Sequence, residues 1–267
     1  KRRSYVSGLE KKLADWDNLR TTVYDGFKRA FETVGPFQVT KINKSEKPRA
    51  KVQERANIVV ISDIHLGLNI DPEEVMCNGY NWQIGARRLG KLAEQTSDFK
   101  FDHRDECPTL HVCLGGDLGQ GIIHLNDAGT DLITFQVVGI TYYLTQMIDH
   151  WRKSYDQIYV HCTPDNHMRL VHKGPDRAMS QKTDSFATMV HFALQMGFRD
   201  CDDVKFDVPK TAITTFNVLG HKFGLTHGDT HIQSGNVGSS VNVKNIATQV
   251  MKLNAIVKDG KHYDCVI

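Results

Sequence analysis

The first pattern along the chain is a stripe of apolar residues near the N-terminus that recur at three- and four-residue steps. This spacing places the side chains on one face of a helix. The residues of the stripe are Leu9, Leu13, Trp16, Leu19, Val23, Phe27, Ala30, Phe31 and Val34, and Gly35-Pro36 ends it. We therefore predict an N-terminal amphipathic helix within residues 1–39. Its apolar face needs covering, either by the main domain or by a second copy of the chain in a homodimer.

A lysine-rich segment with almost no large apolar side chains follows at residues 40–56. That composition is typical of a basic linker. Residues 1–55 together carry 14 Lys or Arg against 7 Asp or Glu, whereas the rest of the chain carries 19 against 24. A basic arm on a mildly acidic body could bring a polyanion such as nucleic acid to a site, although a solvated helical surface would show the same charge pattern.

From Asn57 onward the pattern changes to short runs of apolar and β-branched residues, which are typical of buried strands. These runs are 58–61, 110–114, 158–161, 223–226 and 263–267. Helical patterns lie between them at 82–93, 132–151 and 186–196. Strands that alternate with helices predict an α/β layered domain over residues 57–267.

The composition is that of a globular protein of mixed class. The 267 residues suffice for a sizeable core, and 40% hydrophobic with 24% charged residues is ordinary for such a chain. No stretch approaches the roughly 20 apolar residues of a membrane span, and no apolar signal-peptide region follows Lys1-Arg2-Arg3. We therefore expect a cytoplasmic protein with no membrane partner. The six cysteines lack short paired spacings, which argues against a zinc ribbon or a redox pair.

The candidate chemistry lies directly after the predicted strands. Four of the five strand patterns run into polar clusters, at 62–65 (Ser-Asp-Ile-His), 115–117 (Gly-Gly-Asp), 164–167 (Pro-Asp-Asn-His) and 227–231 (His-Gly-Asp-Thr-His). In open α/β sheets, sites form beyond the carboxyl ends of the strands, where loops bring distant residues together. We therefore expect the clusters to converge in space.

The side chains in these clusters suit divalent metal ions. Carboxylate, imidazole and amide oxygen are ligands that Mn, Fe, Zn or Ni accept. Asp63 and His65 can bind one ion if the chain turns between them, and Asp117 can bridge two ions with its two oxygens. Two ions about 3.5–4 Å apart can hold a hydroxide, polarise a phosphoryl group and support in-line displacement. This chemistry is the hydrolysis of phosphate esters.

The clusters resemble the signature of the calcineurin-like metallophosphoesterase superfamily, which reads D-x-H, G-D, G-N-H, H and G-H-x-H. The matching blocks are Asp63-Ile64-His65, Gly116-Asp117, Asp165-Asn166-His167 and His227. They occur in the right order over roughly residues 57–267, each after a predicted strand. Less specific blocks at 78–81, 121–124 and 166–169 are similar to a subset found in bacteriophages and mobile elements, which implies a phage-encoded protein in a host cytoplasm.

The resemblance implies a four-layer αββα sandwich with a dinuclear centre at one edge of its two sheets. Carried over block by block, it implies that Asp63 and His65 hold the first metal, that Asp117 bridges, and that Asn166 and His227 hold the second. The implied cofactors are two divalent ions, with Mn favoured over Fe, Zn or Ni.

The same resemblance makes His167 the catalytic histidine, which would stabilise or protonate the departing oxygen. An imidazole suits this task because its ordinary pKa is near 6.5. Three departures from the family pattern put parts of the assignment in question. Asp165 replaces the glycine of G-N-H, Met168 stands where an acidic residue often follows, and no G-H-x-H block is present. Asp165 or Asp127 could then supply the partner that orients His167.

Two explanations fit the absent G-H-x-H block. In the first, residues 228–231 are the last block, with Asp229 in place of a histidine. In the second, His227-Gly228-Asp229 is the penultimate block and the final one follows Ile267. We favour the second, because the strand-like residues 263–267 occur where the family's strand leads into G-H-x-H.

Other residues near the blocks are weaker candidates. Three of them could contact metal or substrate, and a structural role explains them equally well: Asp229, His231 and His124. Three cations after the catalytic histidine could contact a phosphodiester backbone or lie in a solvated loop: Arg169, Lys173 and Arg177. Three histidines fall within apolar patterns and are expected to be packed or surface residues rather than ligands: His111, His161 and His191.

The sequence leaves three functions open. The basic N-terminal arm and the phage-like blocks favour a metal-dependent phosphodiesterase that acts on DNA as an exonuclease or endonuclease. A hydrolase of nucleotides or pyrophosphate-linked lipid precursors is the second reading, since His227-Gly228-Asp229 also resembles a block of such enzymes. The third is a catalytically silent binding or scaffold subunit on the same fold.

Overall fold

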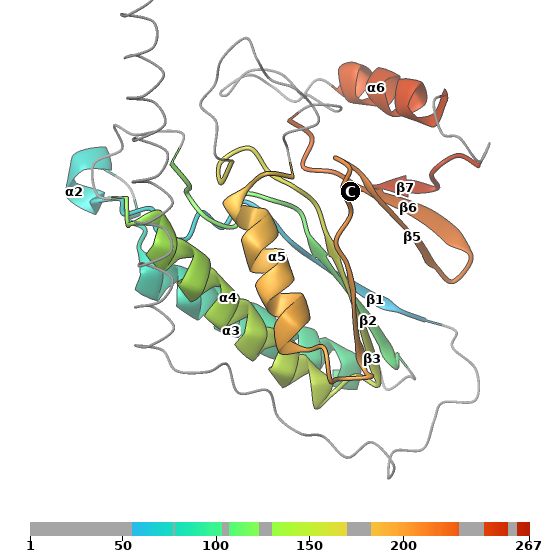
Figure 1. Cartoon of the computed structure of the whole chain (residues 1–267), viewed down its shortest axis with the longest axis horizontal. Helices are drawn as coiled ribbons and strands as arrows, with labels where there is room; N and C mark the ends of the chain where they lie inside the picture. The colour runs from blue at the N-terminus through green and yellow to red at the C-terminus, as the bar shows by residue number, and fades with distance from the viewer. Residues whose placement is uncertain are drawn as a thin grey trace, which may run out of the picture.

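The computed structural model describes residues 55–76, 78–102, 107–122, 130–169, 183–229, 243–255 and 261–267 of the chain. The predicted N-terminal helix, the dimer through it and the linker up to residue 54 lie outside the described residues. Within them the chain forms a mixed α/β fold with a parallel sheet, a second smaller sheet and flanking helices (Figure 1). The predicted α/β class is confirmed.

The larger sheet is parallel throughout, with the strand order β1-β2-β3-β4. Its strands are β1 (Asn57–Ile61), β2 (Thr109–Leu114), β3 (Gln157–Cys162) and β4 (Val204–Asp207). Every residue of β2 is buried, which explains why the strand is a nearly continuous apolar run. The last residues of three strands are register partners, Ile61 with Leu114 and Leu114 with Cys162. The chain therefore leaves β1, β2 and β3 at one edge of the sheet.

Three long helices cover one face of this sheet (Figure 1). They are α3 (Trp82–Asp102), α4 (Ile133–Arg152) and α5 (Phe186–Gly197). α4 contacts both of the others and buries most of its side chains, so it is the central helix of this layer. The main core fills the space between these helices and the sheet, with Trp151, Tyr155 and Phe186 among its largest side chains. None of the described helices has the length and apolar character that crossing a membrane would take.

The second sheet packs on the other face of the parallel sheet (Figure 1). It consists of β5 (Thr214–Val218), β6 (His221–Leu225) and β7 (Cys265–Val266). β5 and β6 form an antiparallel hairpin, and β7 pairs parallel with β6. A small core between the sheets joins Cys113 of β2 to Phe216 and Leu225. Beyond this sheet lies α6 (Val243–Ala255), which is tied to the chain before β7 by a 2.8 Å hydrogen bond from the Tyr263 N–H to Asn254 Oδ1.

The elements expected from the sequence differ from the observed ones in a few places. β1, β2, β3 and β6 and the three long helices lie at the predicted positions, although α3 continues to Asp102. The strand pattern at 263–267 yields only the two residues of β7. The short helix α2 (Pro72–Val75), α6, β4 and β5 were not predicted. β5 was not predicted because its only large apolar residues are Phe216 and Val218, so it lacks the continuous apolar run that marked the other strands.

Candidate metal centre

The polar clusters that follow β1, β2 and β3 meet at the edge of the sheet where these strands end, and the cluster after β6 joins them. Five side chains come together there: His65, Asp117, Asn166, His167 and His227. They come from four loops that are far apart in the sequence. The convergence expected from the strand-end pattern is therefore what the fold produces.

The loops after β1 and β2 hold an unusual backbone conformation. Asp63, His65 and Asp117 have φ values of +52°, +44° and +47°. For side chains other than glycine, this left-handed region costs about 1–3 kcal/mol each and persists only where the surroundings impose it. Here the Asp63 N–H donates to the Gly116 carbonyl at 3.1 Å, and the His65 N–H donates to the Asp117 carbonyl at 3.0 Å. The two loops therefore fix one another and set the directions of the site side chains.

Gly116 is one of the positions in these loops that admit no side chain. Its φ is +100°, and a Cβ there would lie 2.6 Å from Nδ1 of His227. Glycine alone adopts this conformation and leaves room for the imidazole. The glycine of the G-D block thus allows the second sheet to bring His227 against the end of β2.

His65, Asp117 and His167 form a group that could hold a metal ion. Oδ2 of Asp117 lies 4.0 Å from Nε2 of His65 and 3.8 Å from Nε2 of His167. One ligand atom from each residue lies within 4.8 Å of the others. The two imidazole rings meet edge to face, with 4.6 Å between their centroids. Two imidazoles and a carboxylate are a donor set that borderline divalent ions accept.

The orientation of His167 is fixed by the backbone. Its Nδ1 lies 3.1 Å from the carbonyl oxygen of Gln120, and a carbonyl can only accept, so Nδ1 carries the hydrogen. The backbone N–H of His167 also donates to Oδ1 of Asp117 at 3.2 Å. Burial lowers the pKa of His167, and the nearby Asp117 only partly offsets this. The neutral ring therefore directs the lone pair of Nε2 toward Asp117, as a metal ligand or proton acceptor would.

Asp117 also belongs to a second group, with Asn166 and His227. Nε2 of His227 lies 3.3 Å from Oδ2 of Asp117 and 2.6 Å from Oδ1 of Asn166. Nδ1 of the same ring lies 3.0 Å from the carbonyl oxygen of Gly115, so Nδ1 donates its hydrogen there. Nε2 of His227 then faces Oδ2 of Asp117 and Oδ1 of Asn166. The lone pairs of these three atoms would repel one another unless a proton or a metal ion lies between them.

The titration of this group agrees with that requirement. Burial by itself lowers the pKa of His227, but the hydrogen bond and charge of Asp117, with a smaller contribution from Asp229, outweigh it and raise the pKa to about 9. Burial likewise opposes ionisation of Asp117, but His227 and His167 hold the pKa of its carboxyl below the usual value. A proton supplies the positive charge in the metal-free protein, and a divalent ion could replace it. The donor set therefore fits a metal ion.

Two further expected ligands stand apart from these groups. The backbone of Asp63 lies at the same edge of the sheet, but the residue is exposed. Its carboxylate does not belong to the group formed by His65, Asp117 and His167. Asp229 is half-buried and acts on His227 through its charge. Arg169 pairs its backbone with Ser185 in an isolated β-bridge. Four candidates lie outside the described residues: His124, Lys173, Arg177 and His231.

The departures from the G-N-H pattern have a structural explanation. Asp165 is 1% exposed, and its Oδ1 accepts hydrogen bonds from the Met168 N–H at 3.2 Å and the Ser185 hydroxyl at 3.4 Å. Burial and the charge of Asp117 raise the pKa of Asp165 to about 7. Met168 is fully buried in the main core, where an acidic residue would be costly. Asp165 thus ties the turn to the start of α5, and the Gln120 carbonyl helps to orient His167. Asp127, the other expected partner of His167, lies outside the described residues.

The sequence did not reveal the groups that support the ligands. The carbonyls of Gly115 and Gln120 are backbone atoms, so no residue type marks them. Gln136 of α4 is fully buried, accepts from the Gly121 N–H at 2.8 Å and donates to the Asp131 carbonyl at 2.8 Å. In the sequence, the only sign of this role was that Gln136 is a polar residue among the apolar positions of the predicted helix 132–151. Tyr80 similarly donates its hydroxyl to the Ile64 carbonyl between Asp63 and His65.

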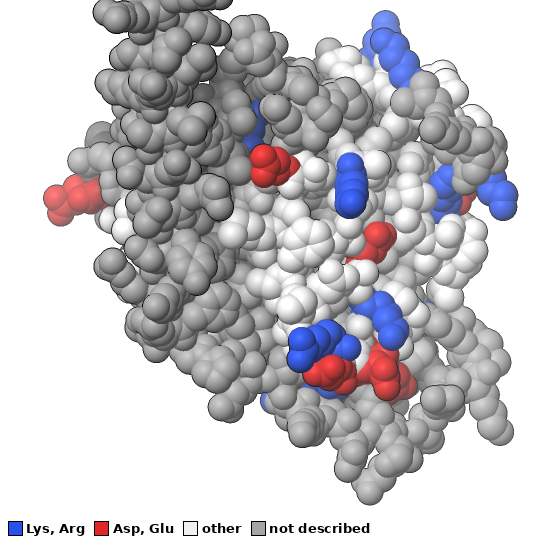
Figure 2. Space-filling model, in the orientation of Figure 1, with Lys and Arg blue, Asp and Glu red and all other residues white. Residues whose placement is uncertain are grey.

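The described charged side chains on the face seen in Figure 2 form no separate binding surface. Figure 2 shows that the described Lys and Arg side chains on this face stand singly or beside Asp and Glu. The described residues therefore form no basic patch on this face.

No protein-family model, curated protein or solved structure matches this chain.

Proposed function

We propose that the chain is a metal-dependent phosphodiesterase that acts on DNA and has the four-layer αββα fold of the calcineurin-like metallophosphoesterases. The observation that carries this proposal is the position of Asp117, whose Oδ2 lies within 4.0 Å of Nε2 of His65, His167 and His227, while Asn166 contacts His227. A carboxylate common to two sets of ligands suits a pair of ions. The order of helices, parallel sheet, second sheet and α6 supports the fold.

Two divalent ions, with Mn²⁺ the first choice, would supply an activated water and positive charge beside the phosphoryl oxygens. His65 and Asp117 would hold one ion, and Asp117, Asn166 and His227 the other. Asp63 leads into the same turn and would complete the first set. The Gly115 carbonyl would keep the His227 ring in place by accepting from Nδ1, so that Nε2 stays directed at the ligands.

His167 would act on the departing oxygen. Its Nδ1–H is engaged by the Gln120 carbonyl, so Nε2 is the atom that can hold a proton and transfer it. The bond from its backbone N–H to Asp117 keeps the histidine at a fixed place beside the ligands. A half-buried imidazole that is neutral at rest can take the proton when a phosphate diester brings negative charge next to it.

The choice of DNA rests on features of the sequence. Residues 1–55 carry an excess of Lys and Arg, which would attract a polyanion. The blocks at 78–81, 121–124 and 166–169 are similar to those of phage and mobile-element relatives in the superfamily. Both features favour a nuclease over a small-molecule hydrolase.

The test is hydrolysis of a chromogenic phosphodiester and of labelled single- and double-stranded DNA with added Mn²⁺. Asp117→Asn is expected to lower the rate about a hundredfold or more, because it removes the ligand common to both groups. Asp202→Asn is the matched control, since Asp202 is an exposed carboxylate outside the centre. Its rate should equal that of the wild type.

Each outcome selects one function. Cutting of DNA that disappears in Asp117→Asn supports the nuclease. Cleavage of the chromogenic diester without DNA cutting supports a hydrolase of small phosphate esters instead. Bound metal with no hydrolysis of any substrate supports a scaffold subunit, and a chain that binds no metal would refute the metal centre itself.

A further inference from the structure

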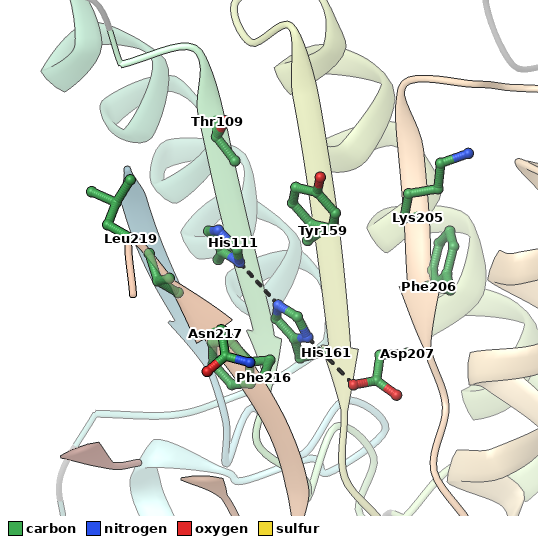
Figure 3. A pocket seen from close by; sticks show the side chains of 11 residues that line it. Thr109, His111, Tyr159, His161, Lys205, Phe206, Asp207, Phe216, Asn217 and Leu219 are labelled. Atoms are coloured by element: carbon green, nitrogen blue, oxygen red, sulfur yellow. Dashed lines mark hydrogen bonds and ion pairs between the residues drawn. The ribbon is translucent and has the colours of Figure 1, made fainter. Parts of the chain in front are cut away.

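A second pocket lies on the face of the parallel sheet that is turned away from the long helices (Figure 3). Its volume is about 460 Å³, within the range of small-molecule sites. The floor is formed by β2, β3 and β4, and one wall is the end of the β5–β6 hairpin around Asn217 and Leu219. Phe216 of the second sheet covers Cys113 of β2 and stacks on His161 of β3, and the cavity lies beside it.

The floor consists of two rows of side chains that register places on the same face. His111, Tyr159 and Lys205 are partners across three strands, and so are Cys113, His161 and Asp207 in the next row. The rings of His111 and Tyr159 are stacked, with 5.0 Å between centroids and 15° between planes. Tyr159 is 37% exposed and ends this row of rings next to Lys205. A planar ring could pack against the exposed edge of Tyr159.

Several polar groups face this pocket with hydrogen-bonding capacity to spare. Within the described residues, no hydrogen bond or ion pair engages the side chains of Thr109, Tyr159, Lys205 or Asn217, and all four line the pocket. Lys205 is exposed and offers a positive charge, while the Asn217 amide offers both a donor and an acceptor. Such convergent groups beside apolar and aromatic walls are typical of ligand sites.

A chain of buried histidines gives the pocket a directed acceptor. Nδ1 of His111 lies 3.0 Å from Nε2 of His161, and Nδ1 of His161 lies 3.7 Å from Oδ2 of Asp207 (Figure 3). Each histidine is 5% exposed, and Nδ1 of His161 has no hydrogen-bond partner within the described residues. Burial lowers the pKa of His111 to about 4 and that of His161 to about 3, so both rings are neutral and carry one hydrogen each.

The carboxylate of Asp207 decides where these hydrogens lie. Because an ionised carboxylate only accepts, it favours the hydrogen of His161 on Nδ1. His161 then accepts at Nε2 from the Nδ1–H of His111. Nε2 of His111 is left without a hydrogen, so His111 presents a hydrogen-bond acceptor to a ligand.

We propose that this pocket binds a small ligand that joins a planar, N–H-bearing ring to an anionic group, the chemistry of a purine nucleoside monophosphate. The ring would pack against the exposed edge of Tyr159 and donate to Nε2 of His111, the Asn217 amide would pair with the ring edge, and Lys205 would bind the phosphate. His111 lies three residues before the end of β2, about 10 Å along the strand, and Asp117 lies in the loop beyond it. None of the metal-centre residues lines the pocket. The pocket is therefore a site separate from the proposed active site.

The test is calorimetric titration of the full chain with adenosine monophosphate in the presence of a chelator, so that no metal-bound site contributes. Adenosine and ribose 5-phosphate are the comparison ligands, since one lacks the anion and the other the ring. Each is expected to bind about tenfold more weakly, the size of one charge-assisted hydrogen bond or one aromatic contact. Lys205→Met should weaken the monophosphate about tenfold and leave the affinity for adenosine unchanged.

Lys252→Met is the matched control, because Lys252 is an exposed lysine on α6 that does not line the pocket. The affinity of Lys252→Met for adenosine monophosphate should equal that of the wild type. Circular dichroism would show that each variant is folded. The proposal is overturned if the monophosphate does not bind or if ribose 5-phosphate binds as tightly. It is also overturned if Asp117→Asn abolishes binding of the monophosphate while Lys205→Met leaves it intact. That result would place the ligand at the metal centre.

Discussion

At the scale of single residues, the candidate metal centre depends on backbone conformations that residues other than glycine disfavour. Asp63, His65 and Asp117 take left-handed conformations, and Gly116 lies between two of the ligand-bearing loops. The strain is local, and the hydrogen bonds between the loops offset it. Asp63, His65 and Asp117 must each combine an unfavourable φ with a side chain that can bind a metal ion, so few other residue types would fit at these positions.

Gly116→Ala should therefore damage the centre more than its size suggests. The added Cβ would lie 2.6 Å from Nδ1 of His227 and 3.1 Å from Cβ of Asp165, at a φ of +100°. We expect the clash to displace the His227 side chain and so to abolish metal binding. The free energy of unfolding should fall by about 2 kcal/mol. Metal content after dialysis and urea denaturation measure the two effects.

Gly90→Ala is the matched control for this substitution. Gly90 lies in α3, and a Cβ there meets no atom within 4 Å. The alanine should raise the free energy of unfolding by up to about 1 kcal/mol, because glycine is a poor helix former, and metal content should not change. Equal metal content in Gly116→Ala and the wild type would contradict the role given to Gly116.

At the scale of elements, the sequence predicts the strands that contain continuous apolar or β-branched runs and misses those that lack them. β1 to β3 were visible because of such runs, whereas β5 has polar residues at its exposed positions. The ligands were visible for a related reason: they are polar residues placed directly after such runs. Their supports, the Gly115 and Gln120 carbonyls, depend on tertiary approach alone and leave no mark in the sequence.

A buried ion-pair network joins α4 to the segment before β4. Arg152 is 3% exposed and donates to Asp203 at 2.8 and 3.1 Å and to Asp149 at 3.0 Å. Arg152→Met should lower the free energy of unfolding by about 3–5 kcal/mol, because two largely buried carboxylates would lose the guanidinium that compensates them. Urea denaturation followed by circular dichroism measures this.

The exposed pair of Arg199 and Asp200 provides the comparison. Their side chains are 67% and 87% exposed, with Nε and Oδ2 3.4 Å apart. Arg199→Met should change the free energy of unfolding by less than about 1 kcal/mol. If the two arginine variants lose the same stability, the buried network does not hold α4 in place.

At the scale of the whole molecule, the metal centre lies where the two sheets meet. Ligands from the loops after β1, β2 and β3 belong to the parallel sheet, and His227 comes from the loop after β6. The only described apolar core between the sheets is small, built around Cys113, Phe216, Val218 and Leu225. A metal ion held by Asp117 and His227 would therefore join two layers that are otherwise held together by few buried side chains.

This arrangement predicts that Mn²⁺ stabilises β6 specifically through His227. Binding at 100 times the dissociation constant would add about 2.7 kcal/mol to the free energy of unfolding, and amide hydrogen exchange would show where. In the wild type, Mn²⁺ should slow exchange in β6 and in the loops of the parallel sheet. In His227→Ala the group of His65, Asp117 and His167 remains, so the loops should still be protected while β6 is not.

His221→Ala is the control on the same strand, because the His221 side chain is 70% exposed and lies outside the centre. In this variant Mn²⁺ should still protect both β6 and the loops. Protection of β6 in His227→Ala would mean that the metal does not join the sheets through this residue.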